Sequence, residues 1–333
     1  MIGKQKTMSK IMKTGLTIYK LRFTSPLHIS NSRSDYGQSL KTIDSDTMYA
    51  ALTSCLAKMG ETISENGDLG FTISSLFPYY QKEKDGKPLY FFPKPINAKL
   101  PETAENRKQI KKIKYLETNY FSQLLSGNVK IEDNNIHGDY LCEQKIEKFI
   151  KTQADQRVSI KDRTMQEEAE PYFIDKIFFK DYSGLFFIAK GDTTNLDKAI
   201  PLLALEGIGT DRNIGNGFFE YKRDTVFLDI PEKADYFLNL SMFFPESKEQ
   251  LSLLMDENSA YEIQRRGGWI TSYPYQSLRK NVIYGFSVGS VFRKETSGLE
   301  TLGKIVDLRP KWNDTDMHSV FRCGRALILP IKI

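Results

Sequence analysis

The order of strand and helix patterns over residues 15–231 constrains the fold of this chain more than any other feature of its sequence. Strand patterns alternate polar and apolar residues or form short aromatic runs, whereas helix patterns repeat apolar residues three and four positions apart. In chain order the patterns are a strand (16–25), a helix (45–60), two strands that predict a hairpin (171–180 and 184–192), a helix (193–208) and a strand (217–231). This order is typical of a ferredoxin-like domain, an α+β unit, and a long insertion is expected at about 61–165.

Local signals refine these boundaries. Ser45 is expected to cap the first helix at its N-terminus. Within the insertion, LYFFP (89–93) predicts a strand and residues 105–127 predict a lysine-rich helical region. Residues 1–14 are polar and are expected to form a flexible lead-in.

Residues 232–333 predict a second, β-rich α+β domain. Its patterns are a strand (235–245), a short helix (246–255) and glycine-punctuated strands at 261–271, 280–292, 303–308 and 325–333. The segment from Pro231 to Asp235 is the expected junction between the two domains.

Composition excludes several function classes. Lysine and arginine number 47 against 42 aspartate and glutamate, and the net charge of +5 is compatible with an anionic partner without requiring one. The three cysteines form no CxxC motif and the three histidines are scattered, so no disulfide set, metal site or other cofactor is expected. The start of the chain lacks the apolar run of a signal peptide, and no stretch approaches the about 18 apolar residues of a membrane span. We therefore expect a soluble, cytoplasmic protein with no membrane partner.

Residues 205–221 (LEGIGTDRNIGNGFFEY) hold four glycines around Asp211-Arg212-Asn213. The segment lacks the GxxxxGK[ST] and GxGxxG patterns, and it leaves a helix and enters a strand, so no helix N-terminus faces a nucleotide. A helix C-cap at Gly207 and a glycine bulge at 215–217 would explain two of the glycines without any ligand. Missing β-carbons and exposed N–H groups also suit close approach of a polyanion, and we favour phosphate contact here.

His28, in PLHIS (26–30), is the one candidate for catalysis. It is either a structural histidine or the general base of a metal-free ribonuclease, with Tyr36 or Lys41 as a guessed partner. The chain has no GxSxG motif, no Cys–His signature and no identifiable pair of catalytic carboxylates, so a catalytic role has little support.

Two segments carry basic residues in patterns that suit RNA. In RRGGWITSYPYQSLRKN (265–281), arginines and lysine interleave with aromatic residues, as in proteins that stack unpaired bases and contact phosphates. The alternative is a surface loop whose aromatic side chains face the core. Arg157, Lys161 and Arg163 nearly alternate within 155–173, and they would line one side of a projecting hairpin or protect a strand edge.

Six motifs occur in the chain in this order: PLHIS, SDTMYAAL, RVSIKDRT, GIGTDRNIGNGFFEY, RRGGWI and GFSVGSVF. Together they resemble the fourth Csm subunit of type III-A CRISPR effector complexes, within the repeat-associated mysterious protein (RAMP) superfamily. The likeness spans about 17–330. It implies two ferredoxin-like (RRM-like) domains and a non-catalytic role, in which the subunit binds and caps the repeat-derived 5′ tag of the CRISPR RNA. It also implies two protein partners, the large polymerase/HD-nuclease subunit and the first backbone RAMP subunit, whereas target RNA would be met only indirectly, through the guide.

The resemblance also implies which residues contact the tag. A thumb-like hairpin that displaces a guide base would map near Arg157 to Arg163, and Ser30 stands where a glycine is common in the superfamily. The remaining implied contacts are His28, Ser30, Ser45, Asp46, Thr47, Gly209, Asp211, Arg212, Asn213, Gly215, Gly217, Arg265, Arg266, Gly267, Gly268 and Trp269.

Three hypotheses follow. The leading one is a CRISPR RNA-binding assembly subunit of a ribonucleoprotein in antiviral defence. The second is a metal-independent RAMP endoribonuclease that processes repeat RNA, with His28 as general base. The third is a general single-stranded RNA-binding module without a dedicated complex.

Overall fold

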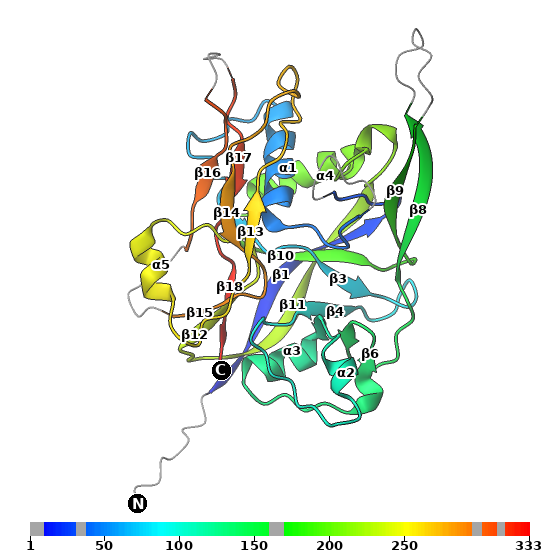
Figure 1. Ribbon diagram of the computed structural model, residues 1–333, viewed down its shortest axis with the longest axis vertical. Coiled ribbons are helices and arrows are strands. Elements are labelled where there is room, and N and C mark those ends of the chain that lie inside the picture. The colour runs from blue at the N-terminus through cyan, green and yellow to red at the C-terminus, as the bar shows by residue number, and fades with distance from the viewer. Residues whose placement is uncertain (1–9, 31–37, 160–169, 295–301, 312–316) are drawn as a thin grey trace, which may run out of the picture.

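A computed structural model describes residues 10–30, 38–159, 170–294, 302–311 and 317–333 (Figure 1). Within these residues, nine strands form one large sheet in the order β11-β1-β10-β3-β4-β5-β7-β6, with β2 also paired to β10. The strands are β1 (Ile11–Phe23), β2 (Phe71–Ile73), β3 (Phe77–Tyr80), β4 (Leu89–Pro93), β5 (Tyr115–Glu117), β6 (Ile136–His137), β7 (Tyr140–Leu141), β10 (Gly184–Gly191) and β11 (Phe219–Pro231). The fold is therefore mixed α+β with a core made mostly of sheet.

Strands β11, β1, β10 and β3 are antiparallel neighbours, and helices α1 (Ser45–Lys58) and α4 (Thr194–Glu206) lie between them in the chain. The six predicted elements all form, but β3, from the predicted insertion, takes the place in this sheet that was expected for residues 171–180. The longest pairing joins β1 to β11 from Ile11 opposite Pro231 to Phe23 opposite Phe219. Residues 11–14, expected in the flexible lead-in, thus belong to β1.

The predicted hairpin of residues 171–192 is wrong. Strand β9 (Glu170–Phe179) pairs instead with β8 (Ile150–Ser159), and the two form a separate ribbon that stands out from the body of the molecule (Figure 1). Residues 184–189 of β10 are buried throughout, so this strand requires neighbours on both edges inside the sheet, and β1 and β3 supply them.

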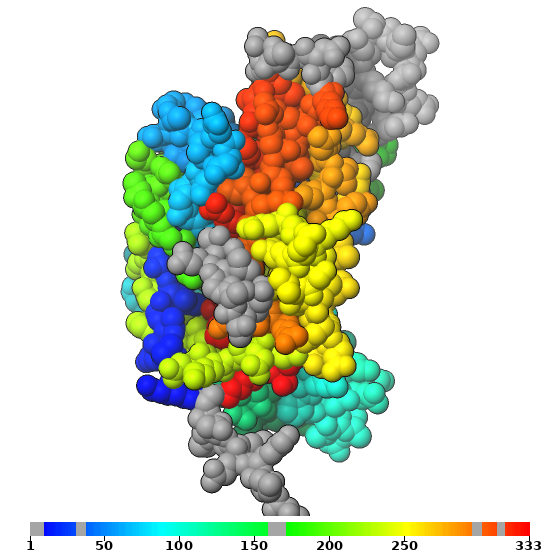
Figure 2. Space-filling model, turned by 90° about the vertical axis from the view of Figure 1, so that its left-hand side faces the viewer, coloured from blue at the N-terminus to red at the C-terminus, as the bar shows by residue number. Residues whose placement is uncertain are grey.

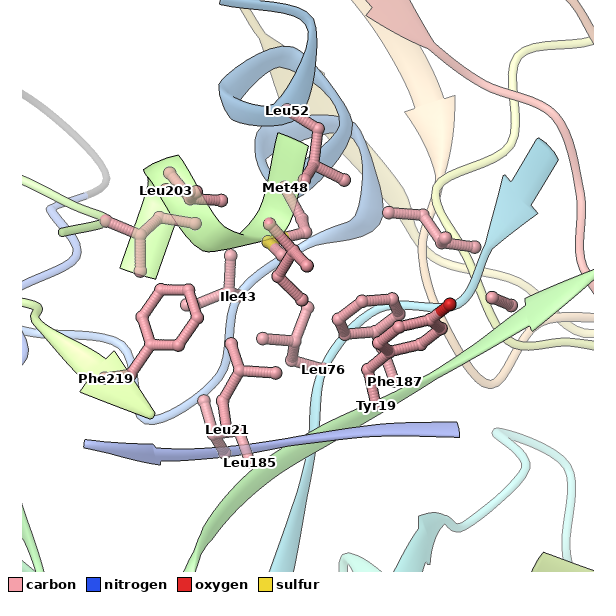
Figure 3. Close-up of a cluster of buried hydrophobic side chains, with 14 of the residues drawn as sticks. Tyr19, Leu21, Ile43, Met48, Leu52, Leu76, Leu185, Phe187, Leu203 and Phe219 are labelled. Atoms are coloured by element: carbon pink, nitrogen blue, oxygen red, sulfur yellow. The ribbon is translucent and has the colours of Figure 1, made fainter. Parts of the chain in front are cut away.

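One face of the sheet packs against α1 and α4 (Figure 3). The apolar positions of α1 face inward as predicted, and Met48 and Leu52 meet Phe187 of β10 and Leu203 of α4 in this cluster. The N-terminus of α1 differs from the prediction. Asp44 occupies the N-cap position without a side-chain capping bond, because its carboxylate is taken by an arginine described below.

The other face of the sheet packs against the insertion and the C-terminal strands. Ile18, Phe186 and Leu228 of the sheet share one apolar cluster with Leu238 and Leu329 from the C-terminal region. The two predicted domains therefore share a core. The predicted helical region 105–127 is divided into α2 (Arg107–Ile110) and α3 (Thr118–Leu125), because β5 between them is pulled into the sheet by pairing with β4 and β7.

The C-terminal region contains several small sheets and one helix. A three-stranded sheet has the order β15-β12-β18, and two strand pairs, β13–β14 and β16–β17, accompany it. Figure 2 shows orange C-terminal residues packed beside light-blue residues of the first hundred, and β17, which the sequence patterns missed, lies against α1. The elements are β12 (Tyr236–Asn239), α5 (Lys248–Leu254), β13 (Ile263–Arg266), β14 (Ile283–Phe286), β15 (Val291–Arg293), β16 (Ile305–Asp307), β17 (Phe321–Cys323) and β18 (Ile328–Ile331).

Among the described residues, no helix is both long and apolar enough to cross a membrane.

Candidate nucleic-acid interface

Three predicted segments meet beside the end of α4: the PLHIS turn (26–30), the glycine loop (207–217) and the base of β9. The amide of Gly217 donates to the Pro26 carbonyl at 2.8 Å, and the amide of Thr210 donates to the His28 carbonyl at 2.9 Å. Leu27 exchanges backbone hydrogen bonds with Ile177 of β9. Segments far apart in the sequence are thus held together by main-chain bonds, and we call this group the loop cluster.

Three of the four glycines in the loop are required by the fold itself. A β-carbon on Gly217 would lie 2.0 Å from the Ile208 carbonyl oxygen, and one on Gly209 would lie 2.5 Å from the His28 carbonyl oxygen. Gly207 ends α4 with a φ of +78° and abuts the Asn216 carbonyl. The glycine count is therefore weaker support for a ligand than the sequence indicated.

Gly215 is different, because its surroundings are open. Its φ is +91°, and no described atom lies within 4 Å of the position that a β-carbon would take. Just before it, the short 3₁₀ turn η2 (Arg212–Ile214) presents an exposed Asn213 and a partly exposed Arg212. Among the described residues, no hydrogen bond or ion pair engages the Arg212 side chain. The loop thus offers a cation and an amide on an open side.

Asp211 joins the loop to the ribbon. Its backbone is left-handed, with φ of +63°, and its carboxylate pairs with Arg157 of β8 at 3.2 Å. This pairing compensates the one negative charge next to Arg212. Arg163 and Lys161, expected on the same hairpin, lie outside the described residues.

His28 serves the fold in this conformation. The residue is fully buried, and its Nδ1 lies 2.6 Å from the Asp175 carbonyl oxygen in β9. A general base must come within hydrogen-bonding distance of its substrate, and in this conformation the ring has no exposed surface. Of its guessed partners, Tyr36 lies outside the described residues and Lys41 is exposed.

A second group of predicted residues lies at the start of α1. We call it the clasp, and it consists of Asp44, Asp46, Thr47, Arg266 and Arg322. The Arg266 guanidinium holds both carboxylate oxygens of Asp46, at 2.9 and 2.6 Å, and also reaches Asp44 at 3.0 Å and Thr47 at 2.8 Å. Arg322 of β17 donates to the Asp46 carbonyl at 3.1 Å. Bidentate pairing of this kind is strong and geometrically specific.

The clasp changes the interpretation of several predicted tag contacts. Asp46 is fully buried and its carboxylate is saturated by arginine. Ser45 is 2% exposed and accepts the amide of Met242 at 2.8 Å. These side chains join α1 to the C-terminal region and have no surface to offer RNA. No sequence pattern pointed to Asp44 or Arg322, since neither stands in a recognisable motif.

The remaining predicted residues lie on the surface next to the clasp. Arg265 is exposed opposite Tyr284 on the β13–β14 pair, and Gly267 and Gly268 follow it. Trp269 pairs with Arg279, whose guanidinium lies 4.8 Å from the indole centroid. Among the described residues, no hydrogen bond or ion pair joins this surface or the clasp to the loop cluster.

In the described ranges, no group of three or more histidine, cysteine, aspartate or glutamate side chains that could hold a metal ion occurs.

Comparisons with known proteins define the class. Residues 232–331 match the CRISPR Csm4 C-terminal domain family. The CRISPR system Cms protein Csm4 of Mycobacterium tuberculosis (strain ATCC 25618 / H37Rv) is 24% identical over 308 residues, which cover 89% of this chain and 93% of that protein. The protein of the same name from Thermococcus onnurineus (strain NA1) is 24% identical over 277 residues, which cover 77% and 84%.

Solved structures share the fold. The chain resembles one in a Csm1–Csm4 cassette in complex with pppApA, with a TM-score of 0.58 and 17% identity, covering 96% of this chain and 98% of that chain. It also resembles one in a Csm3–Csm4 subcomplex of the type III-A CRISPR-Cas interference complex, with a TM-score of 0.57, 18% identity and coverage of 96% and 99%. The class is therefore that of CRISPR system proteins. Within this class, the chain is a Csm4-type protein.

Proposed function

We propose that this chain is a non-catalytic subunit of a type III-A CRISPR interference complex that binds and caps the repeat-derived 5′ tag of the CRISPR RNA. The observation that carries the proposal is the loop cluster, where Arg212 and Asn213 stand on an open loop beside Gly215. A guanidinium next to backbone without β-carbons suits a phosphodiester chain. The positions of the PLHIS turn and the β8–β9 ribbon against the same loop give a tag more than one surface to contact.

In this proposal both halves of the chain are ferredoxin-like units. For the first half, the support is the antiparallel order β11-β1-β10-β3 with α1 and α4 on one face. For the second half, the support is the match of residues 232–331 to the Csm4 C-terminal domain.

The proposal also includes two protein partners, the large polymerase/nuclease subunit and a backbone RAMP subunit. Its support is that the similar solved structures pair a Csm4 chain with Csm1 in one case and with Csm3 in the other. Target RNA would be encountered through the guide and not through this chain.

Arg212→Ala tests the RNA contact. Loss of one charge-assisted bond to phosphate is expected to weaken binding of tag-bearing RNA about tenfold, and to make the salt slope less negative by about 0.7 for a single strand. Affinity measured by fluorescence anisotropy at several salt concentrations checks both values. Arg107→Ala is the matched control, because Arg107 on α2 is an exposed arginine outside the loop cluster. Equal affinities for the two variants would contradict the proposal.

The proposed absence of ribonuclease activity is tested separately. Purified protein is incubated with repeat RNA in EDTA, and no cleavage is expected, because His28 is buried. Cleavage that His28→Ala abolishes would establish the ribonuclease alternative. Co-purification of a large multidomain partner and an RNA with a uniform 5′ end would exclude a general RNA-binding module.

A further inference from the structure

The charges around the clasp do not balance. Arg266 and Arg322 face Asp44 and Asp46, and Lys280 adds a third cation to the same group. Both carboxylates are already engaged by guanidinium groups. Among the described residues, no hydrogen bond or ion pair engages the Lys280 ammonium. One positive charge therefore remains uncompensated at a partly buried position.

The charged groups that act on Lys280 come from three elements. β13 brings Arg266, β17 brings Arg322, and the start of α1 brings Asp46. Burial lowers the pKa of Lys280 to about 7, with further lowering by Arg322 and Arg266 that Asp46 only partly offsets. An anion placed beside the ammonium would remove this repulsion and favour the charged form.

The surface next to Lys280 suits a nucleotide. The Lys280 amide donates to the Gly268 carbonyl at 2.9 Å, which fixes the lysine beside the Gly267-Gly268 turn. Gly268 has a φ of +97°, and no described atom lies within 4 Å of the position of a β-carbon there. The stacked Trp269 and Arg279 pair occupies the adjacent position. A cation, an open backbone and an aromatic ring together fit a phosphate that carries a base.

We propose that Lys280 marks a phosphate-binding site beside the Gly267-Gly268 turn, in which its ammonium contacts the anion directly. The ligand class is a nucleic-acid or nucleotide phosphate. Where the phosphate comes from the CRISPR RNA tag, the inference rests on the proposed function.

The central experiment measures binding of a synthetic tag-bearing RNA by the full chain from about pH 6 to about pH 8. Wild-type affinity is expected to fall as the pH rises above about 7, by up to tenfold per pH unit if one proton is taken up on binding. Lys280→Arg should keep the affinity and lose this pH dependence, because arginine stays charged throughout. Lys280→Met should bind about tenfold more weakly at the acidic end and show a flat profile.

Lys248→Met is the matched control, since it removes the same charge from an exposed position on α5. The proposal is overturned if Lys280→Met matches Lys248→Met in affinity and in pH profile. Removal of a cation from a positively charged cluster does not destabilise the fold, so thermal unfolding of Lys280→Met should show a midpoint no lower than that of the wild type.

A second measurement identifies the source of the phosphate. Inorganic phosphate, compared with chloride at equal ionic strength, should raise the unfolding temperature of the wild type but not of Lys280→Met if the site accepts a free anion. If phosphate has no such effect while RNA binding depends on Lys280, the anion is part of the RNA. The absence of both effects refutes the site. Arg212→Ala, assayed in parallel, separates the proposed RNA-tag binding from the proposed phosphate site. If Arg212→Ala weakens RNA binding and Lys280→Met does not, only the phosphate site at Lys280 is refuted.

Discussion

Gly215 and Gly217 stand two residues apart in one loop, and alanine at each should have very different effects. At Gly217 the new methyl group would lie 2.0 Å from the Ile208 carbonyl oxygen, which is backbone and cannot swing aside. Gly217 is also fixed on both sides, since its amide donates to the Pro26 carbonyl and its carbonyl accepts the Ile208 amide. Relief of the clash therefore requires both bonds to lengthen or break.

The expected changes in the free energy of unfolding follow from these contacts. A left-handed conformation costs a non-glycine residue about 1–2 kcal/mol, and each lost backbone hydrogen bond costs about 1 kcal/mol. Gly217→Ala should thus lower the free energy of unfolding by about 3–4 kcal/mol. At Gly215 the same strain of about 1–2 kcal/mol applies without any clash, because the space there is open.

Urea denaturation of the two full-length variants measures the difference, and the binding of tag-bearing RNA provides a second readout. Gly215→Ala should keep most of the stability and bind the RNA more weakly, since its methyl group occupies the open side of the loop. Equal losses of stability in the two variants would refute the assignment of Gly217 to the fold and of Gly215 to the surface.

The remaining predictions concern three ion pairs. Arg266→Ala leaves the buried Asp46 carboxylate without its main partner and should lower the free energy of unfolding by about 3–5 kcal/mol. Arg223→Ala removes an exposed ion pair and should lower it by at most about 1 kcal/mol. Chemical denaturation measures both values, and similar losses of stability in the two variants would contradict the account of the clasp. The hydrogen bonds from Arg325 hold the pKa of Asp68 below its usual range, so this pair stabilises the fold at neutral pH and the contribution is lost as the pH falls through that lowered pKa. Arg325→Met should therefore flatten the acid limb of a stability–pH curve, and an unchanged limb would show that the pair contributes nothing.

Local patterns predicted those elements whose signals lie within a few residues. The apolar spacing of α1 and the run LYFFP of β4 gave the right elements at nearly the right bounds. The same patterns could not assign partners. Strands β9 and β10 were both recognised, but the choice of β8 or β1 as a neighbour depends on burial across the whole sheet. Three-residue β17 carries too few residues for any periodicity.

At the candidate site, too, the sequence pointed to residues but not to their partners. The family resemblance implied that Asp46 and Arg266 contact the RNA tag, but it could not indicate that they bind each other across 220 positions in the chain. Four glycines in one loop suggested a ligand, yet three of them are explained by carbonyl groups whose approach only the folded chain reveals. Arg212 and Asn213 were chosen from their place between the glycines, and the structure puts both on an accessible loop.

The apolar cluster shared by the sheet and the C-terminal strands has a consequence for synthesis in the cell. Ile18, Phe186 and Leu228 are made well before Leu329, so the part of this sheet face that the last strands cover stays exposed to water until the chain beyond residue 325 emerges. A nascent chain in that state exposes apolar surface and unpaired strands, which favours aggregation. Fusions or truncations that delay or remove the last strands should thus harm solubility before they harm any contact with RNA.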